Sequence, residues 1–119
     1  MQRYIRTNEI KKDFRRYYTT TLSNGNRYQV IAEGQVEDDT LKLRVSRSTS
    51  NGRKIYAYAI VGQQVPGRIE VYYQGQVVKS EDYGSFLESP YDLENSFEYF
   101  DELAYEAVLL TDEVNEEYE

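Results

Sequence analysis

The sequence predicts an α+β fold, in which an antiparallel β-sheet of four to six strands is packed by a long acidic C-terminal helix. Short runs of alternating apolar and polar residues, separated by turn residues, fill the region from about residue 18 to about residue 79. Apolar residues then recur at helical spacing from about residue 90 to about residue 110. A chain of 119 residues fits one domain, which we place at 1–119.

The basic, aromatic N-terminal segment has two interpretations. Its apolar residues recur at i, i+4 and i+7, and they are Ile10, Phe14 and Tyr17. That spacing predicts a short helix over about 8–17. The alternative is a strand that begins near Arg15 and continues through the β-branched residues 19–21. We favour the helix.

The predicted strands follow one another through short turns. They lie at about 18–22, 27–32, 41–47, 55–61, 69–73 and 76–79. Asn24-Gly25 and Asn51-Gly52 favour the positive φ that tight hairpins need, and Gln74-Gly75 predicts a third tight turn. The 55–61 strand carries apolar or aromatic residues on both faces, which predicts a central position in the sheet.

The C-terminal helix has start signals and an apolar stripe. Ser89 is suited to the N-cap, Pro90 to the first helical position, and Asp92 to the positive end of the helix dipole. The stripe consists of Leu93, Phe97, Phe100, Ala104, Ala107 and Leu110. We expect residues 111–119 to form a frayed acidic end.

The net charge of −7 conceals two halves of opposite sign. Residues 80–119 contain fourteen carboxylates and no lysine or arginine, whereas residues 1–79 contain all fourteen basic side chains and seven acids. Three explanations of the acidic half remain open at this stage. The protein's own basic sheet and N-terminus neutralise it, or it is a solvated face without a partner, or it binds an external basic surface.

The leading functional hypothesis uses the helix face that points away from the predicted core. Its candidate partner-binding residues are Tyr91, Asp92, Glu94, Glu98, Tyr99, Asp101, Glu102, Tyr105 and Glu106. The six carboxylates span about 21 Å of helix, or about 3.5 Å per charge, close to the 3.4 Å spacing of phosphates along a DNA strand. In composition the chain resembles the small acidic nucleic-acid mimics with which phages and mobile elements inhibit restriction or CRISPR systems. This resemblance implies a non-catalytic protein that blocks a basic, nucleic-acid-handling partner.

The alternative hypothesis is a nucleic-acid-binding module that uses a basic, tyrosine-rich sheet and an autoinhibitory acidic helix. Its candidate residues are Lys42, Arg44, Arg53, Lys54, Tyr56, Tyr58 and Arg68. Bases stack on aromatic rings and phosphates bind cations in single-strand-binding sheets. Strand tyrosines also pack against cross-strand neighbours, however, and a net negative chain repels a polyanion.

Other functions are disfavoured by composition. The chain contains no histidine and no cysteine, so we expect neither an enzyme nor a thiolate or imidazole metal site. The acidic cluster at 37–39 reads as a turn, and no metal or cofactor is expected. No apolar run approaches the ~20 residues of a membrane span, so we expect cytoplasmic localisation, in a host cell if the chain is phage-encoded. A homo-oligomer is compatible with the sequence.

Overall fold

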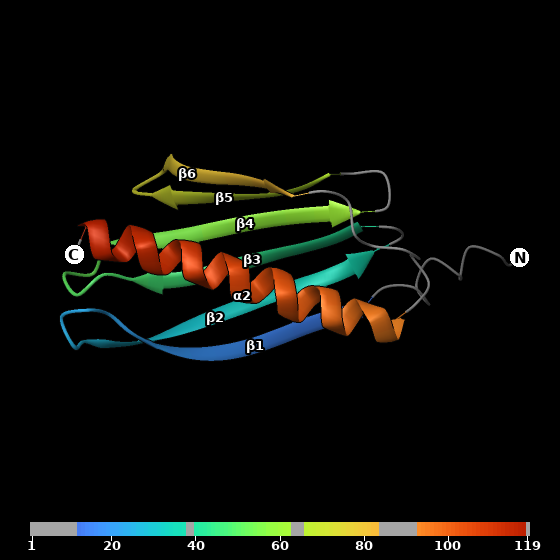
Figure 1. Ribbon diagram of the computed structural model, residues 1–119, viewed down its shortest axis with the longest axis horizontal. Helices are drawn as coiled ribbons and strands as arrows, with labels where there is room; N and C mark the ends of the chain where they lie inside the picture. The colour runs from blue at the N-terminus through green and yellow to red at the C-terminus, as the bar shows by residue number, and fades with distance from the viewer. Residues whose placement is uncertain (1–11, 38–39, 63–65, 84–92, 119) are drawn as a thin grey trace, which may run out of the picture.

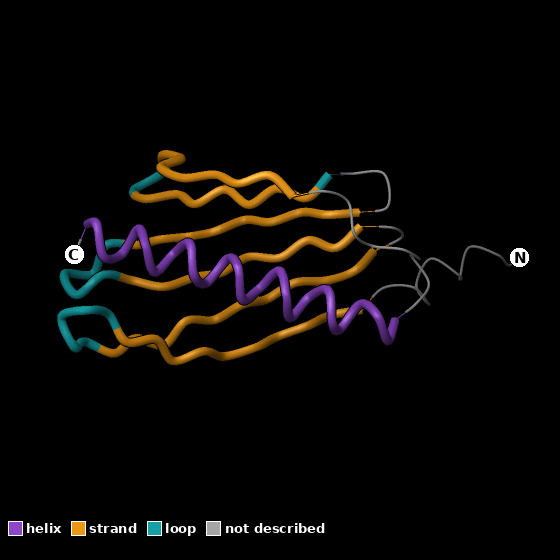
Figure 2. The backbone as a smooth tube through the Cα atoms, in the orientation of Figure 1, coloured by secondary structure: helices purple, strands orange, loops and turns teal. Residues whose placement is uncertain are grey.

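The computed structural model describes residues 12–37, 40–62, 66–83 and 93–118. Within these ranges, six strands form one antiparallel sheet in chain order, and a single helix crosses one of its faces (Figures 1 and 2). The elements are β1 (Lys12–Thr21), β2 (Arg27–Glu37), β3 (Thr40–Ser48), β4 (Lys54–Gly62), β5 (Gly67–Tyr73), β6 (Gln76–Tyr83) and α2 (Leu93–Tyr118). The α+β prediction, with an antiparallel sheet and a C-terminal helix, is confirmed.

The predicted turns join the strands. Gly25 and Gly52 have φ values of 90° and 85°, and the amide of Gly25 donates to the carbonyl of Leu22 at 2.9 Å. This pattern is that of three-residue hairpin loops, in which a type I turn is followed by a left-handed residue. Gln74 and Gly75 both have positive φ, at 52° and 85°, as a two-residue type I′ turn requires.

Side chains of the strands alternate between a face covered by α2 and the opposite face, which no described helix covers and which we call the helix-free face. In β4 the covered residues are buried, and they are Ile55, Ala57, Ala59 and Val61. Tyr56, Tyr58 and Ile60 point to the helix-free face. β4 lies between β3 and β5, so the prediction of a central strand is confirmed.

The core lies between α2 and the sheet. The helix contributes nine buried residues among those described, namely Phe100, Leu103, Ala104, Ala107, Val108, Leu110, Thr111, Val114 and Asn115. Figure 1 shows the helix running obliquely from above β1 towards β4, and it contacts all six strands. The Phe100 ring stacks on Phe14 of β1, with ring centroids 4.9 Å apart, and passes over Gly34 of β2.

The predicted N-terminal helix at 8–17 is wrong over the described residues. β1 occupies Lys12–Thr21 and pairs with β2 along its whole length, while residues 8–11 lie outside the described part. Strand pairing satisfies the backbone of this segment and brings Phe14 against Phe100 in the core. These tertiary contacts outweigh the helical spacing of its apolar residues.

The predicted frayed end is also wrong, because α2 continues to Tyr118. Thr111, Val114 and Asn115 are buried against the sheet, and this packing stabilises the final turns. The proposed start signals at Ser89 and Pro90 lie outside the described residues.

Candidate functional site

The flanks of α2 are neutralised by the protein's own cations. On one flank, Arg16 Nε of β1 lies 3.0 Å from a carboxylate oxygen of Asp101. On the other, Lys79 Nζ of β6 lies 3.0 Å from a carboxylate oxygen of Glu113, and this hydrogen bond raises the pKa of Lys79. Part of the acidic helix is therefore compensated within the fold.

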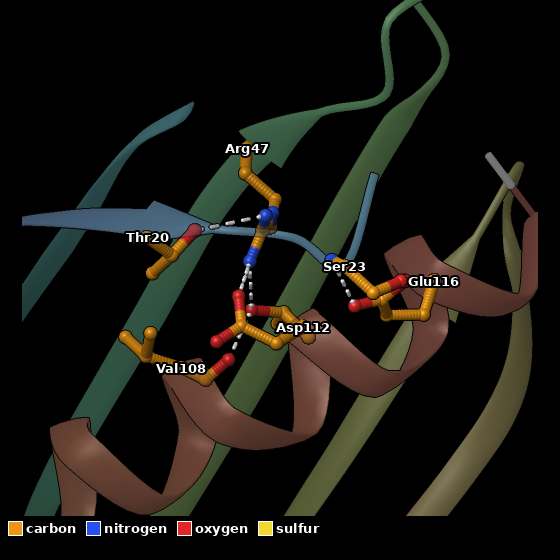
Figure 3. A network of polar contacts seen from close by, with 7 residues as sticks. Thr20, Ser23, Arg47, Val108, Asp112 and Glu116 are labelled. Carbon is orange, nitrogen blue, oxygen red and sulfur yellow. Dashed lines mark hydrogen bonds and ion pairs between the residues drawn. The ribbon is translucent and has the colours of Figure 1, made fainter. Parts of the chain in front are cut away.

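A buried arginine fastens the C-terminal half of α2 to the sheet (Figure 3). Arg47 of β3 is fully buried at its side chain, forms an ion pair with Asp112, and donates to the hydroxyls of Thr20 and Thr111 at 3.2 Å each. Its guanidinium also lies 5.5 Å from the ring centroid of Tyr28. The contacts join β1, β2, β3 and α2 at one point. Sequence reasoning missed this residue, although its alternation with Leu43 and Val45 places it on the covered face.

The last turns of α2 have two further anchors. Glu116 accepts hydrogen bonds from the Ser23 amide at 2.8 Å and from the Ser23 hydroxyl at 2.7 Å, in the loop between β1 and β2 (Figure 3). Tyr118 stacks on Tyr73 of β5, with ring centroids 4.1 Å apart. The end of the helix is therefore held both by the loop between β1 and β2 and by β5.

The outward side of α2 remains uncompensated. We call it the outer ridge, and it consists of Glu98, Glu102, Tyr105, Glu106 and Leu109. No described residue forms an ion pair or hydrogen bond with its three carboxylates. Tyr105 and Leu109 are 56% and 39% exposed. The ridge thus combines negative charge with exposed apolar surface.

The candidate partner-binding residues divide into three groups. Glu98, Glu102, Tyr105 and Glu106 lie together on the outer ridge. Tyr99 is half-buried against the core, and Asp101 is paired with Arg16 on a flank. The remaining three are not placed: Tyr91 and Asp92 lie outside the described residues, and Glu94 is in the first turn without a described side chain.

This division changes the charge spacing that the sequence suggested. Consecutive ridge carboxylates are four residues apart, which corresponds to about 6 Å along the helix axis. That distance is wider than the 3.4 Å phosphate spacing of a DNA strand. The described ridge is an acidic strip without the phosphate repeat.

The alternative candidates also gather, on the helix-free face. Lys42, Arg44, Lys54, Tyr56, Tyr58 and Arg68 all point to it. Arg53 does not belong to this group, because it lies in the turn before β4 and donates to the Tyr73 hydroxyl at 3.1 Å.

Acidic neighbours neutralise much of that cluster. Glu33 forms ion pairs with Arg15 and with Arg44, the latter at 3.4 Å. Arg68 lies 3.0 Å from Glu70 and 2.6 Å from Asp82, and its hydrogen bond to Glu70 is the main cause of its raised pKa. The face therefore lacks the strong positive field of a typical nucleic-acid-binding surface.

The strand tyrosines pack against one another across the sheet. Tyr58 stacks beside Tyr56 at a centroid distance of 6.3 Å and meets Tyr72 edge-on at 5.5 Å. The Arg44 guanidinium lies 6.0 Å from the Tyr56 ring. Beside this cluster is a surface depression of about 720 Å³, which Arg15, Lys42 and Tyr58 help to line.

No protein-family model matches the chain, and no curated protein or solved structure is significantly similar to it. Function must therefore be argued from these surfaces. Within the described ranges, no group of three or more histidine, cysteine or acidic residues could hold a metal ion. No helix in the same ranges has the length and apolar character needed to cross a membrane.

Proposed function

We propose that this chain is a non-catalytic binding protein whose outer ridge engages a basic, nucleic-acid-handling partner and blocks it. The observation that carries the proposal is the difference between the flanks and the ridge of α2. The flank carboxylates Asp101, Asp112 and Glu113 have cationic partners within the fold. The ridge glutamates form no ion pair with these cations, which are Arg16, Arg47 and Lys79.

The ridge carboxylates repel one another within the helix. Glu98, Glu102 and Glu106 are successive i, i+4 neighbours of like charge, and each such pair destabilises a helix by a few tenths of a kcal/mol. A cationic surface would remove this repulsion and gain attraction. Because the charges are exposed, their main effects are on association rate and partner choice.

Tyr105 and Leu109 supply the apolar part of such a contact. Both are large, exposed side chains in the middle of the acidic strip. Tyrosine is enriched among residues that dominate binding energy. We infer that the partner surface is basic with an apolar pocket, as nucleic-acid-binding grooves with base-stacking aromatic residues are.

Removing the ridge charges should weaken partner binding. A Glu98→Gln/Glu102→Gln/Glu106→Gln variant loses three exposed charge interactions, each worth about 0.2–1 kcal/mol, so we expect affinity to fall by roughly 3- to 150-fold. The partner is first identified by capture from nuclease-treated extract of the source cells. Dissociation constants are then measured by calorimetry, and the partner's binding to a labelled oligonucleotide is followed in competition.

A charge-matched variant provides the control. Asp13→Asn/Glu37→Gln/Glu81→Gln removes three exposed carboxylates outside α2, and we expect less than about threefold change in affinity. Equal losses in both variants would show that only net charge matters. Unchanged binding by the ridge variant would exclude the ridge as the contact surface.

The gathering of Lys42, Tyr56 and Tyr58 on one face favours nucleic-acid binding as the second candidate. Fluorescence anisotropy with labelled single-stranded DNA and RNA separates the two. The leading proposal expects no measurable binding to free oligonucleotide. If the chain binds free oligonucleotide tightly and the Lys42→Glu variant does not, nucleic-acid binding by the sheet replaces the leading proposal.

A further inference from the structure

We propose that the helix-free face pairs with the same face of a second copy of this chain, which forms a dimer with the two α2 helices on its outer sides. This inference goes beyond the proposed function and concerns the opposite side of the molecule. It rests on the apolar content, the charge balance and the area of the helix-free face.

A row that is apolar or aromatic in every strand except β3 crosses the sheet on this face. Following the strand register from β1 to β6, the row consists of Tyr17, Ile31, Ser46, Tyr56, Tyr72 and Val77. Tyr17, Ile31 and Val77 are 64%, 37% and 48% exposed. The neighbouring row adds Tyr58, which is 44% exposed. Large apolar or tyrosine side chains therefore occupy this row in five of the six strands, and exposed clusters of this kind are typical of a surface that is covered by a partner.

The charges of this face favour a copy of itself over a polyanion. Among described residues the face holds six cations and five anions: Arg15, Arg27, Lys42, Arg44, Lys54 and Arg68, with Asp13, Glu33, Glu37, Glu70 and Asp82. Several are already paired within one copy, so apposing two such faces brings together nearly neutral surfaces. The acidic helices stay on the outside, where their mutual repulsion is smallest.

The area of the face suits a stable dimer. Six strands at about 4.8 Å spacing and about seven residues at about 3.3 Å rise give a flat area of roughly 600 Å². Side-chain relief increases this towards the ~800 Å² per partner of a standard interface. Its content of tyrosine and arginine matches the composition of interface centres. Two sheets packed in this way form a sandwich with sheets about 10 Å apart.

The oligomeric state tests the inference. Sedimentation equilibrium of the full chain should give twice the 14.0 kDa monomer mass at micromolar concentration. An Ile31→Lys/Tyr58→Lys variant should dissociate, with a dimer dissociation constant raised by about 30-fold or more. The matched control is Leu109→Lys/Tyr105→Lys, which makes similar changes on the outer ridge and should leave the mass unchanged. Circular dichroism melting checks that both variants fold.

A single introduced cysteine locates the contact. The chain has no cysteine, and Tyr58 lies near the centre of the face, so two Tyr58→Cys copies should be joined by a flexible bis-maleimide cross-linker. Tyr105→Cys on the ridge should not. A monomer at all concentrations overturns the proposal, as does cross-linking through Tyr105→Cys alone. Binding of free oligonucleotide to the helix-free face would overturn it as well.

Salt distinguishes this inference from the proposed function. Pairing through apolar rows and internally neutralised charges should persist from about 0.05 to about 1 M salt. Over this range the Debye length falls from about 14 Å to about 3 Å, so exposed charges are progressively screened. Partner binding through the outer ridge should weaken over the same range. A dimer that dissociates with salt contradicts the inference without affecting the ridge hypothesis.

Discussion

An Asp112→Ala variant is expected to lose about 3–5 kcal/mol of unfolding free energy, because it removes a carboxylate that pairs with a fully buried guanidinium. Arg47 also donates to the hydroxyls of Thr20 and Thr111, but a neutral hydroxyl does not replace the carboxylate of Asp112 as a partner for a desolvated charge. The measurement is urea unfolding followed by circular dichroism.

A double-mutant cycle separates the ion pair from simple loss of packing. Arg47→Met removes the buried charge and leaves Asp112 partly hydrated, since its side chain is 24% exposed, so its effect should be smaller. The Arg47→Met/Asp112→Ala double variant should be more stable than Asp112→Ala alone. Glu102→Ala, which removes an uncompensated carboxylate from the same helix, should change stability by less than about 0.5 kcal/mol. Additive losses in the cycle would contradict the assignment of Arg47 and Asp112 as a coupled pair.

A Gly34→Ala variant is expected to lose about 3 kcal/mol, although alanine is intrinsically better than glycine in a strand. A Cβ atom here would lie 2.5 Å from the Lys42 carbonyl oxygen, 2.8 Å from Leu43 Cβ and 3.0 Å from the Phe100 ring. Two of these neighbours belong to β3, whose position is fixed by pairing on both sides. Thermal unfolding should show a midpoint lowered by about 10 °C or more.

Two further variants test which contacts cause the loss of stability in Gly34→Ala. Phe100→Leu relieves only the ring contact, so the Gly34→Ala/Phe100→Leu double variant should not recover stability. Gln29→Ala changes an exposed residue of the same strand and should have a small effect. A stabilising Gly34→Ala substitution would show that β2 and β3 can separate at this point.

The fold was predictable where local signals agree with the tertiary structure. Alternating residues in β3 and β4 and the Asn-Gly turns specify strands and hairpins without reference to distant contacts. β1 was mistaken for a helix because polar residues interrupt its covered face. Arg16 and Thr20 point towards α2, where they bind Asp101 and Arg47, and this hides the period of two.

The end of α2 was mistaken for a frayed segment for the same physical reason. Thr111, Asp112 and Asn115 are polar, but two of them bind Arg47 and the third is buried. Sequence could separate the acidic ridge from the apolar stripe by helical periodicity. It could not show which acids the sheet neutralises, because the paired residues are far apart in the sequence. Arg47 and Asp112 are 65 positions apart, and Arg16 and Asp101 are further apart still.

The chain-order sheet has a consequence for biosynthesis. Each strand pairs with its sequence neighbour, so the hairpins can assemble in turn while the chain is being made. The covered face, however, has no cover until α2 follows β6. A nascent sheet exposes Ile55, Val61 and Ile69 to solvent during that interval. We expect ribosome-bound intermediates that lack α2 to recruit chaperones or aggregate.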